Sequence, residues 1–70
     1  MNVACSNATV VAAVREVLLE YGVAQMRQQG PNFGDPMIWL LVSVPVTIGN
    51  DKEREARRAI ALIDGATIYS

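Results

Sequence analysis

Residues able to act as nucleophiles, general bases or metal ligands are scarce in this sequence. There is no histidine, so neither a Ser-His-Asp triad nor a Cys-His pair can form. The one cysteine, Cys5, excludes an intrachain disulfide and, with only scattered carboxylates, a structural zinc site. The sequence contains neither of the two common glycine-rich nucleotide-binding motifs, GxGxxG and the P-loop GxxxxGK(S/T). We therefore expect a protein that is not an enzyme and uses no metal and no cofactor.

Two sets of residues have types that catalysis uses. Cys5 would be a nucleophile only if its surroundings lowered its pKa, and a lone cysteine is more often a small buried apolar residue. Glu16 and Glu20 stand four residues apart, as an acid–base pair on a helix would. With Arg15 beside them, they are more typical of a solvated helix exterior. We expect neither set to catalyse a reaction.

Arg54, Arg57 and Arg58 share one side of a predicted helix and are the best candidates for an anion site. Interleaved acidic residues balance the basic ones in this segment, which is typical of an ion-paired surface. The net charge of the whole chain is −1, without the basic footprint of a nucleic-acid binder. An anionic-ligand or nucleotide pocket between subunits is the alternative function, and nucleic-acid binding is not expected.

The elements that would position these residues begin with a helix. Apolar residues recur at three- and four-residue steps and define its buried side: Val10, Val11, Val14, Val17, Leu18 and Tyr21. Ser6, Asn7 or Thr9 is placed to cap its start. Gly22 suits the left-handed conformation that ends many helices.

The segment 23–29 is ambiguous between a continued helix and a polar edge strand, and we favour the strand. It would form a hairpin with the next segment through the turn-rich loop 30–36. Phe33 lies in that loop between Pro31 and Pro36. It is either a recognition element at a loop tip or a plug that folds back onto the body.

Residues 37–48 carry the strongest pattern, because every even position is aliphatic: Ile38, Leu40, Val42, Val44, Val46 and Ile48. This alternation predicts one long strand with its even side in the core. Met37, Trp39 and Leu41 would lie on the opposite side, where Trp and Met are typical interface anchors. Pro45, which has no amide to donate, fits a part of the strand that lacks a neighbour.

A second helix should begin at Asn50, with Asn50 and Glu53 forming a capping box. Its buried stripe is Ala56, Ala59, Ile60 and Ile63, and Gly65 ends it. Residues 66–69 then read as a short final strand.

These elements predict a single α+β domain over residues 1–70, a two-layer sandwich of order α-β-β-α-β. The sheet would be three-stranded and mixed, with the last strand parallel to a long central strand 37–48 and both helices on one face. Residues 44–48 would then extend beyond both neighbouring strands, and such exposed edges recruit strands from other chains.

The size and the composition of the chain indicate self-association. A chain of 70 residues that is 51% hydrophobic has a small core and more apolar residues than that core needs. We therefore expect a homo-oligomer, most simply a dimer, that binds a protein partner as a regulator, inhibitor or adaptor. No segment is long and apolar enough to span a membrane, and one free cysteine without an export signal favours the cytoplasm.

Overall fold

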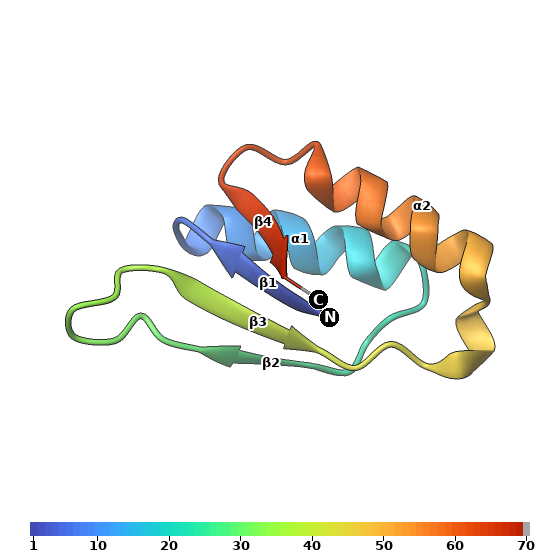
Figure 1. The fold of residues 1–70 in the computed structure, drawn as a ribbon, viewed down its shortest axis with the longest axis horizontal. Coiled ribbons are helices and arrows are strands. Elements are labelled where there is room, and N and C mark those ends of the chain that lie inside the picture. The colour runs from blue at the N-terminus through green and yellow to red at the C-terminus, as the bar shows by residue number, and fades with distance from the viewer. Residues whose placement is uncertain (70) are drawn as a thin grey trace.

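The computed structural model describes residues 1–69 and contains four strands and two α-helices (Figure 1). In chain order these are β1 (Asn2–Cys5), α1 (Ala8–Glu20), β2 (Met26–Gln29), β3 (Ile38–Val42), α2 (Asn50–Ala61) and β4 (Ala66–Tyr69). A short 3-10 helix, η1 (Val46–Ile48), precedes α2. The α+β class and the two helices agree with the prediction.

The four strands form one antiparallel sheet of order β2-β3-β1-β4. With the element order β-α-β-β-α-β, this is the ferredoxin-like, or split β-α-β, arrangement. Helix α1 contacts β1, β3 and β4, and α2 contacts α1 and β4. Both helices therefore lie on the same face of the sheet, and β2 forms the edge that is farthest from them (Figure 1).

The core lies between the sheet and the helices. From the sheet it contains Val3, Cys5, Ile38, Leu40 and Val42, and from the helices mainly Val10, Val11, Val14, Leu18 and Ile60. The inward side of β3 is confirmed, and so are the predicted stripes in most of their residues, since Val17 and Ile63 also pack against the cluster and Ala56 is buried. Tyr21 and Ala59 are only half-buried and lie outside the cluster. Alternation along each strand then leaves the odd positions of β2, β3 and β4 and the even positions of β1 on the other face.

The predicted three-stranded mixed sheet is wrong because residues 2–5 form a fourth strand. β1 lies between β3 and β4, pairing Val3 with Leu40 on one side and with Ile68 on the other. The last strand is consequently antiparallel to β1 and does not touch β3. The central position of β1 places Val3 and Cys5 in the core. Outside the sheet, these two apolar side chains would be exposed to solvent.

The predicted strand 37–48 is also wrong in its second half. β3 ends at Val42, and the chain turns at Pro45 into η1. Of the even-numbered aliphatic residues after Val42, Val44 and Ile48 still pack against the core. Val46 does not, and it is 97% exposed. Within residues 1–69, no long strand therefore overhangs its neighbours, and the exposed strand end that was expected to recruit other chains does not form.

The helix ends show which capping predictions hold. The Asn7 side chain accepts a hydrogen bond from the Val10 N–H at 3.0 Å, so Asn7 is the cap of α1 among the three candidates. At the other end Gly22 has φ +82°, and the Val23 N–H donates to the Leu18 carbonyl, which is the Schellman arrangement.

The predicted capping box of α2 does not form. Asn50 is already the first helical residue, the cap position falls on Gly49, and no side chain bonds a free amide there. A residue with helical backbone geometry cannot also serve as the extended cap residue.

The strand interpretation of the ambiguous segment is confirmed for residues 26–29, which pair with β3 from Met26–Val42 to Gln29–Trp39. The hairpin closes in a turn in which Asn32 and Asp35 exchange backbone hydrogen bonds of 3.1 and 3.0 Å. The Asp35 carboxylate also accepts from the Met37 N–H at 3.1 Å. These bonds hold the tip of the hairpin in one defined shape.

Candidate functional site

The candidate site is the face of the sheet that the helices leave uncovered, which we call the open face. Its side chains follow from strand alternation and register: Asn2 and Ala4 of β1, Arg27 and Gln29 of β2, Trp39 and Leu41 of β3, Thr67 and Tyr69 of β4. In the register, Asn2 stands between Leu41 and Tyr69, and Ala4 stands between Trp39 and Thr67. Trp39 and Leu41 thus lie on the side opposite the core, as predicted.

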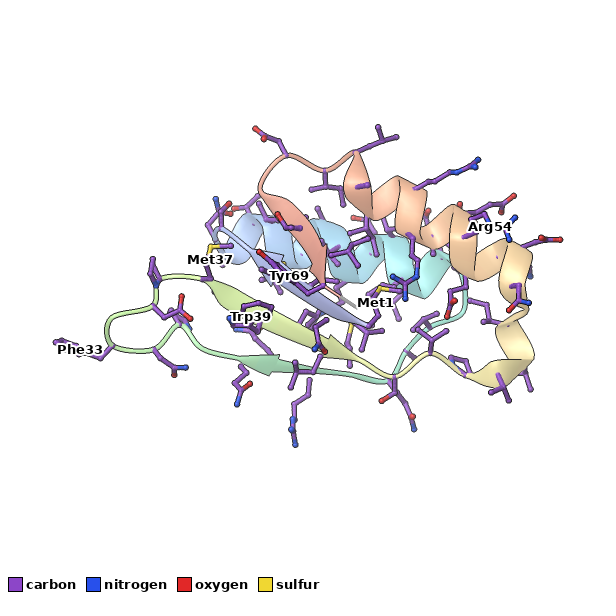
Figure 2. All side chains as sticks on the ribbon, viewed as in Figure 1. Met1, Phe33, Met37, Trp39, Arg54 and Tyr69 are labelled. Atoms are coloured by element: carbon purple, nitrogen blue, oxygen red, sulfur yellow. The ribbon has the colours of Figure 1, made fainter. Side chains whose placement is uncertain are left out.

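An aromatic pair dominates this face. The ring centroids of Trp39 and Tyr69 are 5.3 Å apart and the ring planes are inclined by 54° (Figure 2). The two residues belong to β3 and β4, which flank β1, so the rings meet across the middle strand. Ala4 of β1 is only 2% exposed although no helix covers its face, which indicates that the two rings shield it.

Tyr69 is a functional candidate that the sequence reasoning missed. The sequence predicts a final strand at residues 66–69 that runs parallel to β3 and pairs with it. β4 does run parallel to β3, because both are antiparallel to β1, but β1 lies between them. The side-chain neighbours of Tyr69 therefore differ from those that the predicted pairing implies. Once β1 separates β3 from β4, alternation puts Tyr69 and Thr67 on the same face as Trp39.

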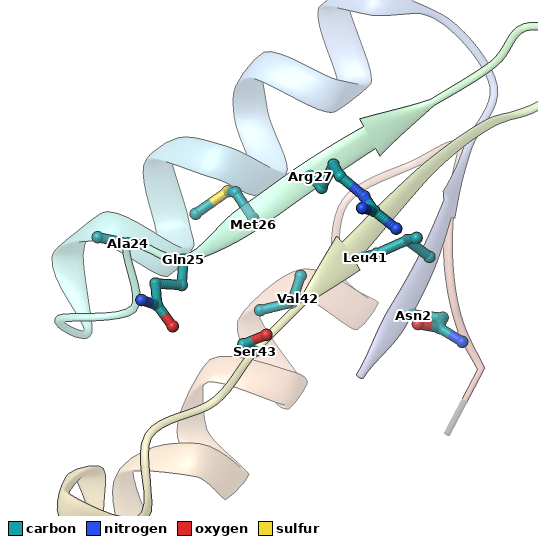
Figure 3. A pocket seen from close by; sticks show the side chains of 8 residues that line it. All are labelled: Asn2, Ala24, Gln25, Met26, Arg27, Leu41, Val42 and Ser43. Carbon is teal, nitrogen blue, oxygen red and sulfur yellow. The ribbon is translucent and has the colours of Figure 1, made fainter.

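A hollow lies where β2 begins and β3 ends (Figure 3). Two of its lining residues, Asn2 and Leu41, neighbour Tyr69 and Trp39 in the sheet. Its volume is about 660 Å³, and its lining includes Asn2, Gln25, Arg27, Leu41 and Ser43. The Ser43 N–H donates to the Gln25 carbonyl at 2.9 Å, which continues the β2–β3 register beyond the strands. The side chains of Gln25 and Ser43 therefore share the parity of the open face.

The other predicted contact residues lie apart from this surface or at its border. Met37 precedes β3 and is half-buried, and Pro45 is exposed at the bend between β3 and η1. Phe33 projects from the tip of the β2–β3 hairpin with an exposed fraction of 110% (Figure 2). Of the two roles considered for Phe33, the plug that folds back is therefore wrong.

The arginines of α2 line neither the hollow beside β2 nor the smaller one at the start of α2. Arg54 lies 3.9 Å from Asp51 and Arg57 lies 4.0 Å from Glu53, the i,i+3 and i,i+4 pairs expected of a solvated helix. Arg58 is exposed on the same helix. The surroundings of Arg54 and Arg57 are thus those of an ion-paired helix surface.

The three residues whose types catalysis uses lie in different surroundings: Cys5 in the core, Glu16 and Glu20 on the surface of α1. Cys5 is fully buried in the core, and this burial raises the pKa of its thiol above the ordinary value. A raised pKa disfavours the thiolate that a nucleophile requires. Glu16 and Glu20 are exposed on α1.

Within residues 1–69, no group of three or more cysteines and carboxylates is close enough to hold a metal ion. Over the same described range, neither helix has the length and apolar character needed to cross a bilayer. Comparison with protein-family models, with curated proteins and with solved structures found no match to this chain.

Proposed function

We propose that this chain is a non-enzymatic binding module that engages a protein partner through the open face. The role is that of a regulator, inhibitor or adaptor, which changes what the partner does by occupying part of its surface. A buried free thiol suits a reducing compartment, so the cytoplasm is part of the proposal.

The single observation that carries this proposal is the Trp39–Tyr69 pair. Tyr69 is an exposed large apolar residue, and Trp39 is only half-buried, in the middle of a sheet face that no other described element covers. Tryptophan and tyrosine dominate the binding energy of protein interfaces when they sit near the centre of the contact. The two rings already contact each other, so their order costs a partner little conformational entropy on binding.

The proposal includes self-association, with a homodimer as the simplest form. Its support is the apolar content of a small chain together with two partly exposed surfaces, the open face and the outer edge of β2. Size-exclusion chromatography with light scattering should show a mass of about twice the monomer at high concentration. A clean monomer there would remove self-association and leave partner binding untouched.

Partner binding is tested with Trp39→Ala against the wild type. Proteins captured from an extract of the source organism are identified by mass spectrometry, purified, and titrated with each variant by calorimetry. Removing a central aromatic anchor is expected to weaken binding about 30-fold, which corresponds to about 2 kcal/mol.

Leu62→Ala is the matched control, because Leu62 is a large apolar residue that is highly exposed at the end of α2 and lies outside the open face. This variant should bind as the wild type does. Circular dichroism must show that both variants remain folded. If Trp39→Ala is folded and binds with unchanged affinity, the open face is not the binding surface.

A further inference from the structure

We propose that the hollow on the open face binds a carboxylate of the partner, with Arg27 as its ligand, next to an apolar side chain seated on Leu41 and Trp39. This inference rests on the proposed function, because it names the chemistry of the partner segment at the same surface.

Among residues 1–69, Arg27 is the only one with a charged side chain on the open face. The two ion pairs found within residues 1–69 both lie on α2, so the Arg27 guanidinium has no carboxylate partner in the described structure. The acidic side chains are on α1, on α2, at the hairpin tip and in the turn before β4: Glu16, Glu20, Asp35, Asp51, Glu53, Glu55 and Asp64. A face with a charge of +1 on a chain with a net charge of −1 orients a partner that carries a negative group.

The side chain of Arg27 reaches from β2 toward Leu41 of β3 (Figure 3). Its planar fork of N–H donors matches the two oxygens of a carboxylate. The amides of Asn2 and Gln25 and the hydroxyl of Ser43 line the same hollow and supply further donors. These groups suit an anion with several acceptor oxygens.

Apolar contacts adjoin the polar end. Leu41 stands directly opposite Arg27 in the register, and Trp39 is the next residue of β3 on the same face. A volume of about 660 Å³ lies within the range of roughly 300–1,000 Å³ typical of small-molecule sites. This hollow is open to solvent, and its lining residues Asn2 and Leu41 neighbour Tyr69 and Trp39 in the sheet, so a peptide segment fits it better than an enclosed small molecule does.

The inference is tested by titrating ¹⁵N-labelled protein with three probes in an NMR experiment. N-acetylphenylalanine offers a terminal carboxylate beside an apolar ring, and acetyl-Phe-Asp-amide offers a side-chain carboxylate. N-acetylphenylalanine amide offers the ring alone. Shifts are expected at the amides of Arg27, Leu41 and Ser43, with binding of the better carboxylate probe about five-fold tighter than that of the amide.

The two carboxylate probes distinguish a chain terminus from an acidic side chain as the source of the anion. Arg27→Gln should abolish the preference for the carboxylate, whereas Arg58→Gln, which removes an exposed cation on α2, should retain it. Equal binding of the amide probe to the wild type, or an unchanged preference in Arg27→Gln, would overturn the assignment of Arg27.

The same variants separate this inference from the proposed function. If the captured partner depends on Trp39 but binds Arg27→Gln as tightly as the wild type, the carboxylate site is wrong and the open face still binds protein. If Trp39→Ala binds the partner as tightly as the wild type does, the function assigned to the aromatic pair is wrong. If the wild type nevertheless prefers the carboxylate probes, the carboxylate site in the hollow is retained.

Discussion

Ala4 is the residue that allows an aromatic pair to form across three strands. Trp39 stands opposite Ala4 in the sheet, and Tyr69 lies one step along on the far side of β1. A methyl group at this position leaves room for both rings above the middle strand, whereas a larger side chain would stand between them. Such a pair contributes about 0.5–1.5 kcal/mol beyond the area that it buries, so the open face is partly ordered before any partner arrives.

Cys5 makes a prediction at the same scale, because burial raises the pKa of its thiol above the ordinary value of 9.0. In the unfolded chain the thiol ionises near that value, while in the folded protein it stays protonated. The contribution of Cys5 to the free energy of unfolding is therefore fully present below pH 9 and declines as the pH rises further, by at most about 1.4 kcal/mol per pH unit.

Urea unfolding of the wild type and Cys5→Ala at pH 7, 9 and 10 measures this effect. Cys5→Ala retains every other group that titrates between pH 7 and pH 10, so the difference between the two proteins isolates the thiol. We expect the stability advantage of the wild type to shrink between pH 9 and pH 10. An advantage that stays constant with pH would show that the thiol is not protected as its full burial indicates.

At the scale of elements, two asparagines provide a matched comparison of helix capping. Asn7 bonds a free amide of α1, while Asn50 makes no such bond at α2. Asn7→Ala should lower the free energy of unfolding by about 1 kcal/mol, and Asn50→Ala should change it by less than about 0.5 kcal/mol. Urea unfolding measures both. A larger loss for Asn50→Ala would reinstate the capping box that the sequence suggested.

The elements that the sequence predicted well are those with long or local signals. Helix α1 holds five of the six apolar residues of the predicted stripe, and a glycine follows its end. The hairpin around Phe33 is marked by glycines and prolines in its loop. These features are decided by neighbouring residues, so composition and spacing suffice.

β1 shows why the remainder was not predictable. A strand of four residues places only Val3 and Cys5 in the core, and two residues cannot display a period. Its central place depends on pairing with β3 and β4, which lie more than thirty residues away in the chain. The sequence alone thus predicts Met37, Trp39 and Leu41 on the side opposite the core. The places of Tyr69 and Arg27 and the hollow follow only from the strand order.

At the scale of the whole molecule, a close contact joins the segment after β1 to the turn before β4. The Ser6 N–H, after β1, donates to the Gly65 carbonyl, before β4, at 2.9 Å. Gly65 has φ +92°, and a Cβ there would collide with the Ser6 hydroxyl and lie 3.0 Å from a methyl group of Val10. This glycine therefore serves both the turn and the close approach of two distant segments.

Gly65→Ala should consequently destabilise the protein more than Gly22→Ala does. Both glycines have a positive φ, which costs an alanine about 1–2 kcal/mol, but Gly22 has no atom within 4 Å of the added Cβ. We expect a further loss of about 1 kcal/mol or more at Gly65 from the collision. Adding Ser6→Ala should recover part of that loss, and urea unfolding of the three variants measures it. Equal losses at the two glycines would contradict the close approach.

The molecule is longer than a sphere of its size would be, with extents of 37 × 20 × 18 Å and a radius of gyration of 11.5 Å, against about 11 Å for a compact chain of this length. The β2–β3 hairpin accounts for the long axis, because it projects beyond the helices (Figure 1). The open face continues onto this projection through Gln29 of β2.

Because Asn2 lies opposite Tyr69 in the β1–β4 ladder, both ends of the described chain emerge at one place (Figure 1). Both residues belong to the open face. A fusion protein or purification tag attached at either end would therefore sit beside the surface proposed for binding and obstruct it. A bait carried on the solvent side of α2, for example through Glu55→Cys and a biotin reagent, keeps that surface accessible, since the native thiol at position 5 is buried.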